Sequence, residues 1–83
     1  MARLNTVVYT MTDCPFCAKA KEILRDMKIE FEERNVTEHP RFAKELRDRT
    51  RDNKLPTVII NKSVLVKPGE DKLRATVNYE LHR

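Results

Sequence analysis

The chain has 83 residues, which is enough for one small domain and too few for two. It carries 17 basic and 13 acidic residues, a formal net charge of +4, with the two signs interspersed. This composition suits an acidic partner and does not indicate nucleic-acid binding, and no apolar stretch approaches the roughly 18 residues of a membrane span. The start of the sequence lacks a signal-peptide pattern, so we expect a cytoplasmic protein with no nucleic-acid or membrane partner.

The first predicted strand and helix frame the only two cysteines. Residues 4–9 contain the β-branched and aromatic run Val7-Val8-Tyr9, which is typical of a buried strand. Residues 15–27 predict a helix, because a proline suits its first position and apolar side chains recur with a period of about 3.6 residues. The recurring apolar residues are Phe16, Ala20, Ile23, Leu24 and Met27.

A second strand and a second helix are expected in the middle of the chain. The strand covers residues 30–35 and the helix roughly 40–52. The thin apolar stripe of this helix consists of Phe42, Ala43 and Leu46. The first strand, helix and second strand form a βαβ unit, which implies a right-handed crossover between two parallel strands.

A β-hairpin and a final helix complete the prediction. Residues 57–60 and 63–66 form the strands, and Asn61 tolerates the positive φ that a two-residue turn needs. A helix over 70–81 follows. The order β-α-β-α-β-β-α predicts a single α/β domain over residues 1–83, with a four-stranded mixed sheet flanked by three helices.

Only two residues separate the cysteines, in the motif Cys14-Pro15-Phe16-Cys17. Cys14 is expected at the N-terminus of the first helix, where unpaired N–H groups and the helix dipole stabilise a thiolate. Cys17 lies one turn inward, within reach of Cys14. This arrangement favours disulfide exchange, in which Cys14 attacks a substrate disulfide and Cys17 resolves the mixed disulfide. Pro15 stiffens the turn, and Phe16 offers a partner an apolar surface.

Neighbouring charges are expected to act on the Cys14 thiol in opposite directions. Lys19 and Lys21 either add positive charge nearby and favour the thiolate, or are solvated and contribute little. Asp13 places a carboxylate beside the thiol and should raise its pKa. The size of the Asp13 effect is left open.

The cysteine pair has three other interpretations. A structural disulfide across two residues would close a very small loop and remove little entropy from the unfolded chain. A zinc site needs about four ligands, and His39 and His82 match no zinc-finger spacing. The third interpretation is an inert pair, but a C-x-x-C motif beside a βαβ unit is typical of a redox site.

Together these segments resemble the glutaredoxin-like branch of the thioredoxin superfamily over nearly the whole chain. VVYTMTDCPFC resembles the strand and active-site turn, KLPTVII the segment with the cis-proline, and KPGEDKL the start of the last helix. The resemblance implies a thioredoxin-like fold and a dithiol–disulfide oxidoreductase that carries electrons to disulfide-containing proteins. It also implies a monomer without a bound cofactor, reduced by glutathione, another low-molecular-weight thiol or a flavoprotein reductase.

The resemblance also implies roles for individual residues, with the two cysteines as nucleophile and resolving thiol. Leu55 would present its peptide groups to an extended substrate. Pro56 would be cis, although a trans proline at a strand start is also common. Asp71 would face a substrate amino group, with Glu70 as a substitute and helix stabilisation as the alternative role. The implied substrate-binding residues are Thr12, Pro15, Phe16, Lys54, Leu55, Pro56 and Asp71, with no metal ligand.

Different parts of the sequence resemble different subfamilies. YTMTDC and FEERNVTEHP resemble NrdH-type redoxins, which reduce ribonucleotide reductase, whereas CPFC resembles dithiol glutaredoxins and PTVIINKSVLVKPGEDKL resembles mycoredoxin-like homologues. Glutaredoxins usually have a lysine where this chain has Met11, and a Gly-Gly turn before the last helix where this chain runs Val66-Lys67-Pro68-Gly69. NrdH-type proteins usually lack a proline after the first cysteine, where this chain has Pro15. The alternative function is therefore an NrdH-type hydrogen donor for ribonucleotide reductase, reduced by a thioredoxin-reductase-like flavoprotein.

The segment RFAKELRDRTRDNK, residues 41–54, is strongly charged. It is either a docking surface for an acidic partner or, as we favour, a solvated helix face with i,i+3 and i,i+4 ion pairs. Arg51 and Lys54 are the most relevant, because they lead towards Pro56. A further alternative function is a non-catalytic binding module that holds an acidic partner with this segment and the adjacent proline edge.

Overall fold

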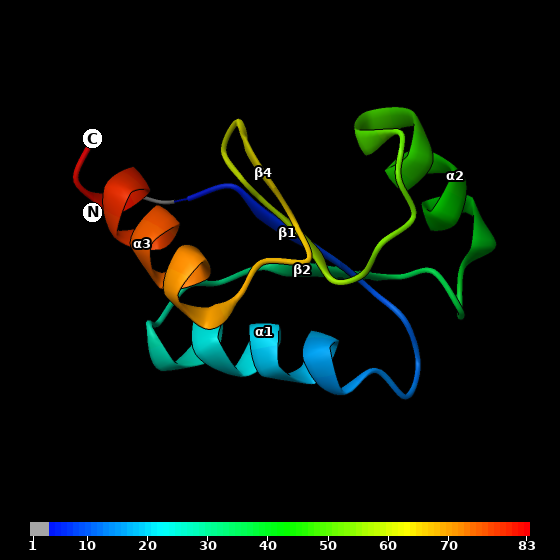
Figure 1. Ribbon diagram of the computed structural model, residues 1–83, viewed down its shortest axis with the longest axis horizontal. Helices are drawn as coiled ribbons and strands as arrows, with labels where there is room; N and C mark the ends of the chain where they lie inside the picture. The colour runs from blue at the N-terminus through cyan, green and yellow to red at the C-terminus, as the bar shows by residue number, and fades with distance from the viewer. Residues whose placement is uncertain (1–3) are drawn as a thin grey trace.

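The computed structural model describes residues 4–83, which form seven elements in the predicted order (Figure 1). The predicted mixed α/β fold is therefore confirmed. Among these residues, no helix combines the length and the apolar character needed to cross a bilayer. The elements are β1 (Thr6–Thr10), α1 (Pro15–Asp26), β2 (Glu32–Asn35), α2 (Pro40–Thr50), β3 (Thr57–Ile60), β4 (Ser63–Val66) and α3 (Glu70–Leu81).

The first two helices end earlier than predicted. After α1 ends at Asp26, Lys28 adopts a φ of 62°, and after α2 ends at Thr50, Arg51 adopts a φ of 58°. Both values lie in the left-handed region, which stops a right-handed helix. The first two strands begin later than predicted, whereas β3, β4 and α3 have the predicted bounds.

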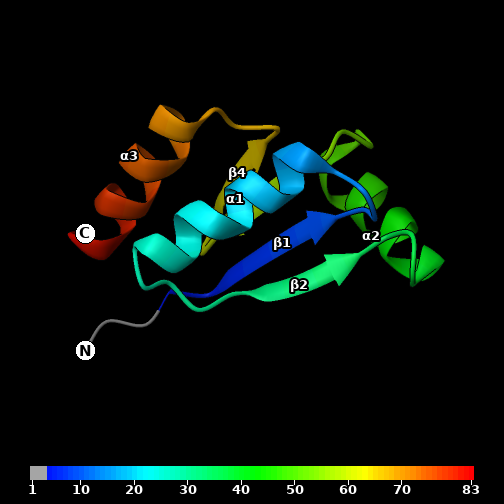
Figure 2. The ribbon, with the colours of Figure 1, turned by 90° about the horizontal axis from the view of Figure 1, so that it is seen from below.

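The four strands form one mixed sheet in the order β2-β1-β3-β4. β1 and β2 are parallel, with Val7 opposite Glu32 and Thr10 opposite Asn35, and their arrows point the same way in Figure 2. β3 runs antiparallel to both β1 and β4. Asn61, in the turn between β3 and β4, has a φ of 56°, which is positive as predicted. Because β1 and β2 end side by side, the residues that follow them gather at one edge of the sheet.

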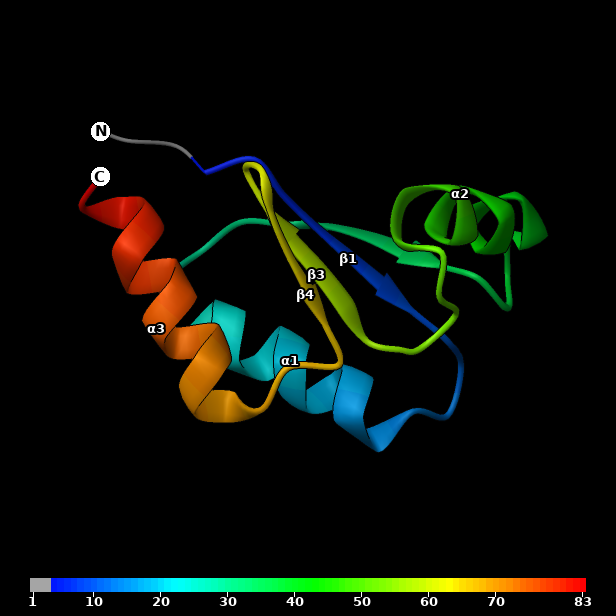
Figure 3. The ribbon, with the colours of Figure 1, turned by 45° about the horizontal axis from the view of Figure 1, so that its top comes forward.

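The helices lie on both faces of the sheet, with α1 and α3 on one side and α2 on the other (Figure 3). Burying an aliphatic side chain contributes about 1.5–3 kcal/mol, so the larger α1–α3 core dominates the stability. That core consists of Val8, Ala20, Ile23, Leu24, Val58, Ile60, Leu65, Leu73 and Val77. The smaller core beneath α2 consists of Tyr9, Leu46 and Ile59.

A polar cluster reinforces the contact between α2 and the sheet. The hydroxyl of Tyr9 donates a hydrogen bond to Glu45, and the guanidinium of Arg34 donates to Glu45 and, over 3.1 Å, to the Tyr9 oxygen. Burial, followed by the bond to Glu45, raises the pKa of Tyr9, and the bond from Tyr9 lowers the pKa of Glu45. The charged face of α2 is exposed, as favoured above, but the predicted ion pairs within this helix do not form; Glu45 pairs with β2 instead.

Phe16 does not join the core that the apolar period of α1 predicts. Its side chain is 65% exposed, whereas Ala20, Ile23 and Leu24 are buried. Phe16 lies on the same helix face as Ala20 but at the start of α1, where its ring lines an open groove with Lys67 and Pro68. The other expectation for Phe16, an apolar surface beside the cysteines, agrees with this exposure.

Candidate redox site

The turn between β1 and α1 positions the first cysteine. Asp13 adopts a φ of 59°, and Cys14 follows in an extended conformation as the N-cap of α1, with Pro15 in the first helical turn. The Cys14 sulfur accepts a hydrogen bond from the Cys17 N–H over 3.1 Å. A sulfur atom at this position therefore satisfies a helix-terminal donor, as an N-cap oxygen usually does.

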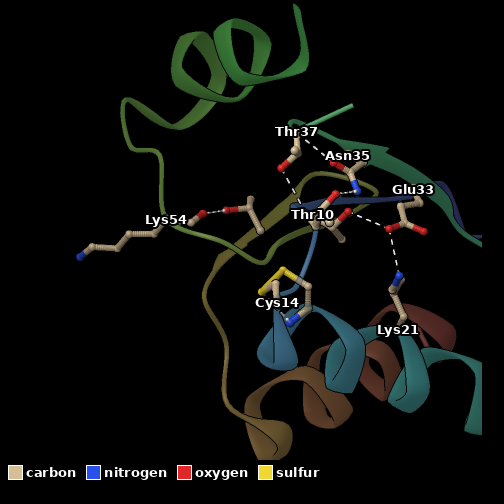
Figure 4. Close-up of a disulfide and its surroundings, with 10 residues drawn as sticks. Thr10, Cys14, Lys21, Glu33, Asn35, Thr37 and Lys54 are labelled. Carbon is tan, nitrogen blue, oxygen red and sulfur yellow. Dashed lines mark hydrogen bonds and ion pairs between the residues drawn. A yellow bond between two sulfur atoms is a disulfide. The ribbon is translucent and has the colours of Figure 1, made fainter. Parts of the chain in front are cut away.

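The two cysteines form a disulfide, with their Cα atoms 5.2 Å apart (Figure 4). They differ in accessibility, because Cys14 is partly exposed whereas only 1% of the Cys17 residue surface is exposed. A partner thiol or disulfide therefore reaches Cys14 first. Cys17 is shielded by the helix that carries both residues.

The Leu55–Pro56 peptide bond is cis, which confirms the conformation that the resemblance implied. Pro56 is buried, and its carbonyl accepts a hydrogen bond from the Lys67 N–H over 2.8 Å. Another hydrogen bond of this turn runs from the Thr57 hydroxyl to the Lys54 carbonyl over 2.9 Å. Leu55 precedes β3 and lies outside its ladder of paired residues, so the sheet does not use its peptide groups.

Lys21 does not supply a free positive charge to the thiol, contrary to the expectation from sequence. Its ammonium group donates to Glu33 on β2 over 2.9 Å, and the buried Thr10 hydroxyl donates to the same carboxylate oxygen over 2.7 Å (Figure 4). Burial raises the pKa of Glu33, but the bonds from Lys21 and Thr10 outweigh it, so the pKa is lowered. The lysine and the carboxylate therefore largely cancel each other's charge.

A hollow of about 450 Å³, which we call the acidic hollow, borders the disulfide on the β2 side. The structure adds β2 and its following turn to the predicted site, since the ends of parallel strands meet here. Thr12, one of the predicted residues, donates its N–H to Thr37 over 3.2 Å and lies near Asn35. The residues lining the hollow are Met11, Thr12, Asp13, Cys14, Cys17, Ala18, Lys21, Glu33, Asn35 and Glu38.

A second, more apolar groove of about 300 Å³, which we call the Phe16 groove, runs between α1 and the start of α3. The ammonium nitrogen of Lys67 lies 5.1 Å from the centroid of the Phe16 ring. In the sequence, Lys67 stands out only as part of the departure from the Gly-Gly turn of glutaredoxins. The groove is lined by Phe16, Lys19, Ala20, Ile23, Lys67, Pro68, Gly69, Glu70 and Leu73.

Two predicted residues lie apart from these cavities. Lys54 belongs to the surroundings of the disulfide in Figure 4, but its ammonium group points away and lies 4.0 Å from Asp52. Asp71 is exposed in the first turn of α3 and lines neither the hollow nor the groove, whereas its predicted substitute Glu70 lines the groove. Over residues 4–83, no three histidine, cysteine or acidic side chains gather in a way that could hold a metal ion.

Comparison with known proteins agrees with this geometry. The glutaredoxin family model matches residues 6–65. A glutaredoxin-like 8.6 kDa protein in a rubredoxin operon of Clostridium pasteurianum is 29% identical over 59 residues, which cover 71% of this chain and 79% of that protein.

Solved structures give the same result. The NrdH-redoxin of Escherichia coli, described as a glutaredoxin-like protein with a thioredoxin-like activity profile, matches with a TM-score of 0.75 and 27% identity, over 86% of this chain and 92% of that one. A glutaredoxin from Brucella melitensis matches with a TM-score of 0.68 and 28% identity, over 95% and 84% respectively. The fold is thus the thioredoxin-like fold of glutaredoxins, and the chain belongs to the glutaredoxin family.

Proposed function

We propose that the protein is a dithiol–disulfide oxidoreductase that reduces disulfides in proteins or mixed disulfides. The observation that carries this proposal is the pairing of a partly exposed Cys14 at the N-terminus of α1 with a shielded Cys17 bonded to it. In the reduced protein, the helix terminus and the Cys17 N–H stabilise a thiolate on Cys14. The same N–H already bonds to the Cys14 sulfur in the disulfide form.

The reaction takes two exchange steps. The Cys14 thiolate attacks one sulfur of the substrate disulfide, a mixed disulfide forms, and the other substrate sulfur leaves as a thiolate that takes up a proton. The Cys17 thiol then loses its proton and attacks the Cys14 sulfur, which releases the second substrate thiol. Two electrons pass to the substrate, and the protein is left with the Cys14–Cys17 disulfide described above.

The substrate segment is proposed to lie across the cis-proline turn. Leu55 has peptide groups outside the β3 ladder, so an extended chain pairs with them while its disulfide reaches Cys14. Phe16 provides an exposed apolar contact on the other side of the motif. Both contacts use the backbone or an apolar ring, which favours acceptance of several protein substrates.

The electron donor is either a low-molecular-weight thiol such as glutathione or a flavoprotein reductase. A second candidate function, an NrdH-type hydrogen donor for ribonucleotide reductase, is supported by the similarity to the NrdH-redoxin of Escherichia coli and by the uncharged Met11 beside the motif. In this case the flavoprotein would be the donor. We also propose that the protein acts as a monomer in the cytoplasm and needs no bound cofactor.

The test is a disulfide reductase assay on the wild type and on Cys14→Ser. The wild type is expected to reduce a protein disulfide when a donor is supplied, and the variant is expected to be inactive; full activity of the variant would end the proposal. Timing the reduction of the oxidised wild type by each donor in turn identifies the donor. Rapid reduction by a thioredoxin-reductase-like flavoprotein alone selects the NrdH-type function.

A further inference from the structure

Phe16 is a large aromatic side chain that the core does not use. It lies in the first turn of α1, two residues after Cys14, and is 65% exposed. Its ring forms part of the wall of the Phe16 groove, which continues towards the start of α3. Any substrate held at Cys14 therefore has this ring as a neighbour.

Lys67 contacts that ring with its side chain and the cis-proline turn with its backbone. The residue adopts a φ of 47°, a conformation unusual for a non-glycine residue, and its N–H donates to the carbonyl of the cis-proline Pro56 over 2.8 Å. Its ammonium nitrogen then lies 5.1 Å from the centroid of the Phe16 ring, which is within cation–π distance. Lys67 thus connects the cis-proline turn to the helix that carries the cysteines.

The other lysines at the site are occupied by carboxylates. Lys21 bonds to Glu33, and Lys19 lies 3.9 Å from both Glu22 and Glu70. Glu70 in turn pairs with Arg74 over 2.9 Å. Within residues 4–83, no carboxylate lies within 4.0 Å of the Lys67 ammonium group.

The charges on the two sides of the site differ in sign. In the acidic hollow, Lys21 neutralises Glu33, and Asp13 and Glu38 remain without a basic partner among the residues described. In the Phe16 groove, Lys19 and Glu70 offset each other, which leaves Lys67 as the unpaired charge.

We propose that Lys67, seated over Phe16, binds a carboxylate of the disulfide substrate. This inference rests on the proposed function and specifies its substrate as a disulfide with a carboxylate on the groove side of the reacting sulfur. An ammonium group against an aromatic face keeps donors free for such a carboxylate. The Lys67 backbone is held by its bond to Pro56, and the ring contact favours the side-chain position over the groove. The carboxylate belongs to a small thiol compound or to an acidic side chain beside a protein disulfide.

The experiment compares Lys67→Met with Lys67→Arg and with the matched control Lys62→Met, which removes an exposed lysine in the β3–β4 turn. The probes are the aromatic disulfides 5,5′-dithiobis(2-nitrobenzoate), which carries carboxylates, and 4,4′-dithiodipyridine, which carries none. Lys67→Met is expected to lower kcat/KM for the carboxylated probe by roughly three- to fivefold and to leave the uncharged probe unchanged. Lys67→Arg and Lys62→Met are expected to behave like the wild type with both probes.

Two disulfide-linked peptides, one with glutamates beside the cystine and one with glutamines, identify the source of the carboxylate. A loss confined to the glutamate peptide assigns the site to acidic protein segments, and a loss confined to the aromatic probe assigns it to small molecules. Equal losses on charged and uncharged probes, or no loss on any, would overturn the role of Lys67 while leaving the oxidoreductase intact. Only a wild type inactive on every probe would overturn the proposed function itself.

Discussion

The ammonium group of Lys21 on α1 lies 2.9 Å from the carboxylate of Glu33 on β2, beside the cysteine motif. This ion pair joins the helix that carries the motif to the outer strand of the sheet. Its members are 12 positions apart in the sequence and meet because β2 returns alongside β1. Because Glu33 offsets the charge of Lys21, this lysine does not act as the free positive charge near Cys14 that its position in the sequence suggests.

Glu33→Gln is expected to reduce the acid sensitivity of the fold. Burial raises the pKa of Glu33, but the bonds from Lys21 and Thr10 lower it further, so the net folded-state pKa lies below the unfolded one. The carboxylate therefore stabilises the fold above its unfolded pKa, and this contribution is lost as the pH falls through the folded pKa. Between about pH 7 and about pH 3, the free energy of unfolding should fall by about 0.5 kcal/mol less in the variant.

Urea unfolding at the two pH values measures this difference. Glu22→Gln is the matched control, since Glu22 is an exposed acid of α1 that lies 3.9 Å from Lys19. The control should keep the acid sensitivity of the wild type. Identical pH dependence in Glu33→Gln and the wild type would contradict the stabilising role of the ion pair.

Cys17→Ser is expected to stop the reaction at the mixed disulfide. Without the resolving thiol, the Cys14 sulfur attacks the substrate and stays bonded to it. Mass spectrometry of the variant after exposure to a disulfide-linked peptide should show one added peptide half on Cys14. Cys14→Ser serves as the control and should show none, because the remaining Cys17 is 1% exposed; an adduct on Cys17 instead would reverse the assigned roles.

Tyr9→Phe is expected to loosen α2 while sparing the cysteine motif. The substitution keeps the ring in the smaller core and removes only the hydroxyl that bonds to Glu45 and Arg34. A hydrogen bond to a charged group contributes about 1.5–3 kcal/mol, and the loss should fall at the lower end because Glu45 keeps Arg34 as a partner. Hydrogen exchange should become faster in α2 and stay unchanged in α1; uniform acceleration in both helices would contradict a local role.

Leu24→Ala and Phe16→Ala are expected to separate stability from substrate contact. Leu24 is fully buried in the larger core, so its truncation should cost about 2–5 kcal/mol of unfolding free energy. Phe16 is 65% exposed, and its truncation should change the stability by no more than about 0.5 kcal/mol. Thermal unfolding measures the stability of both variants, and the reductase assay measures their contact with the substrate. The expectation for stability is contradicted if Phe16→Ala unfolds as easily as Leu24→Ala.

The order of elements follows from local features that the sequence displays directly. Val7-Val8-Tyr9 marks a strand, and the apolar period after Pro15 marks a helix. The helix ends are less visible, because Lys28 and Arg51 adopt left-handed conformations that glycine or asparagine usually marks. Both residues are exposed, and their N–H groups bond to the helix-end carbonyls of Arg25 and Arg47, so these ends depend on local backbone hydrogen bonds that the residue types do not indicate.

Some features of the candidate site can likewise be predicted from the sequence, whereas others depend on the fold. The spacing of Cys14 and Cys17 indicates the chemistry, and the cis conformation of Pro56 was implied by the family resemblance. Glu33 lies in a polar, partly exposed strand without alternating hydrophobicity, so its place beside the motif depends on the sheet register. Lys67 likewise has no sequence feature that marks it as a site residue, and only the structure places its ammonium group over the Phe16 ring.

The two faces of the sheet are held by separate sets of contacts. α2 is attached to its face by a three-residue apolar core and the Tyr9–Arg34–Glu45 cluster, whereas the cysteine helix packs on the opposite face. Substitutions on the outer surface of α2 can therefore accumulate during evolution, or be introduced by design, without repacking the layer that carries the cysteines. The cysteine pair and the exposed face of α2 thus lie on opposite sides of the sheet, so a new recognition surface on α2 would leave the surroundings of the cysteines unchanged.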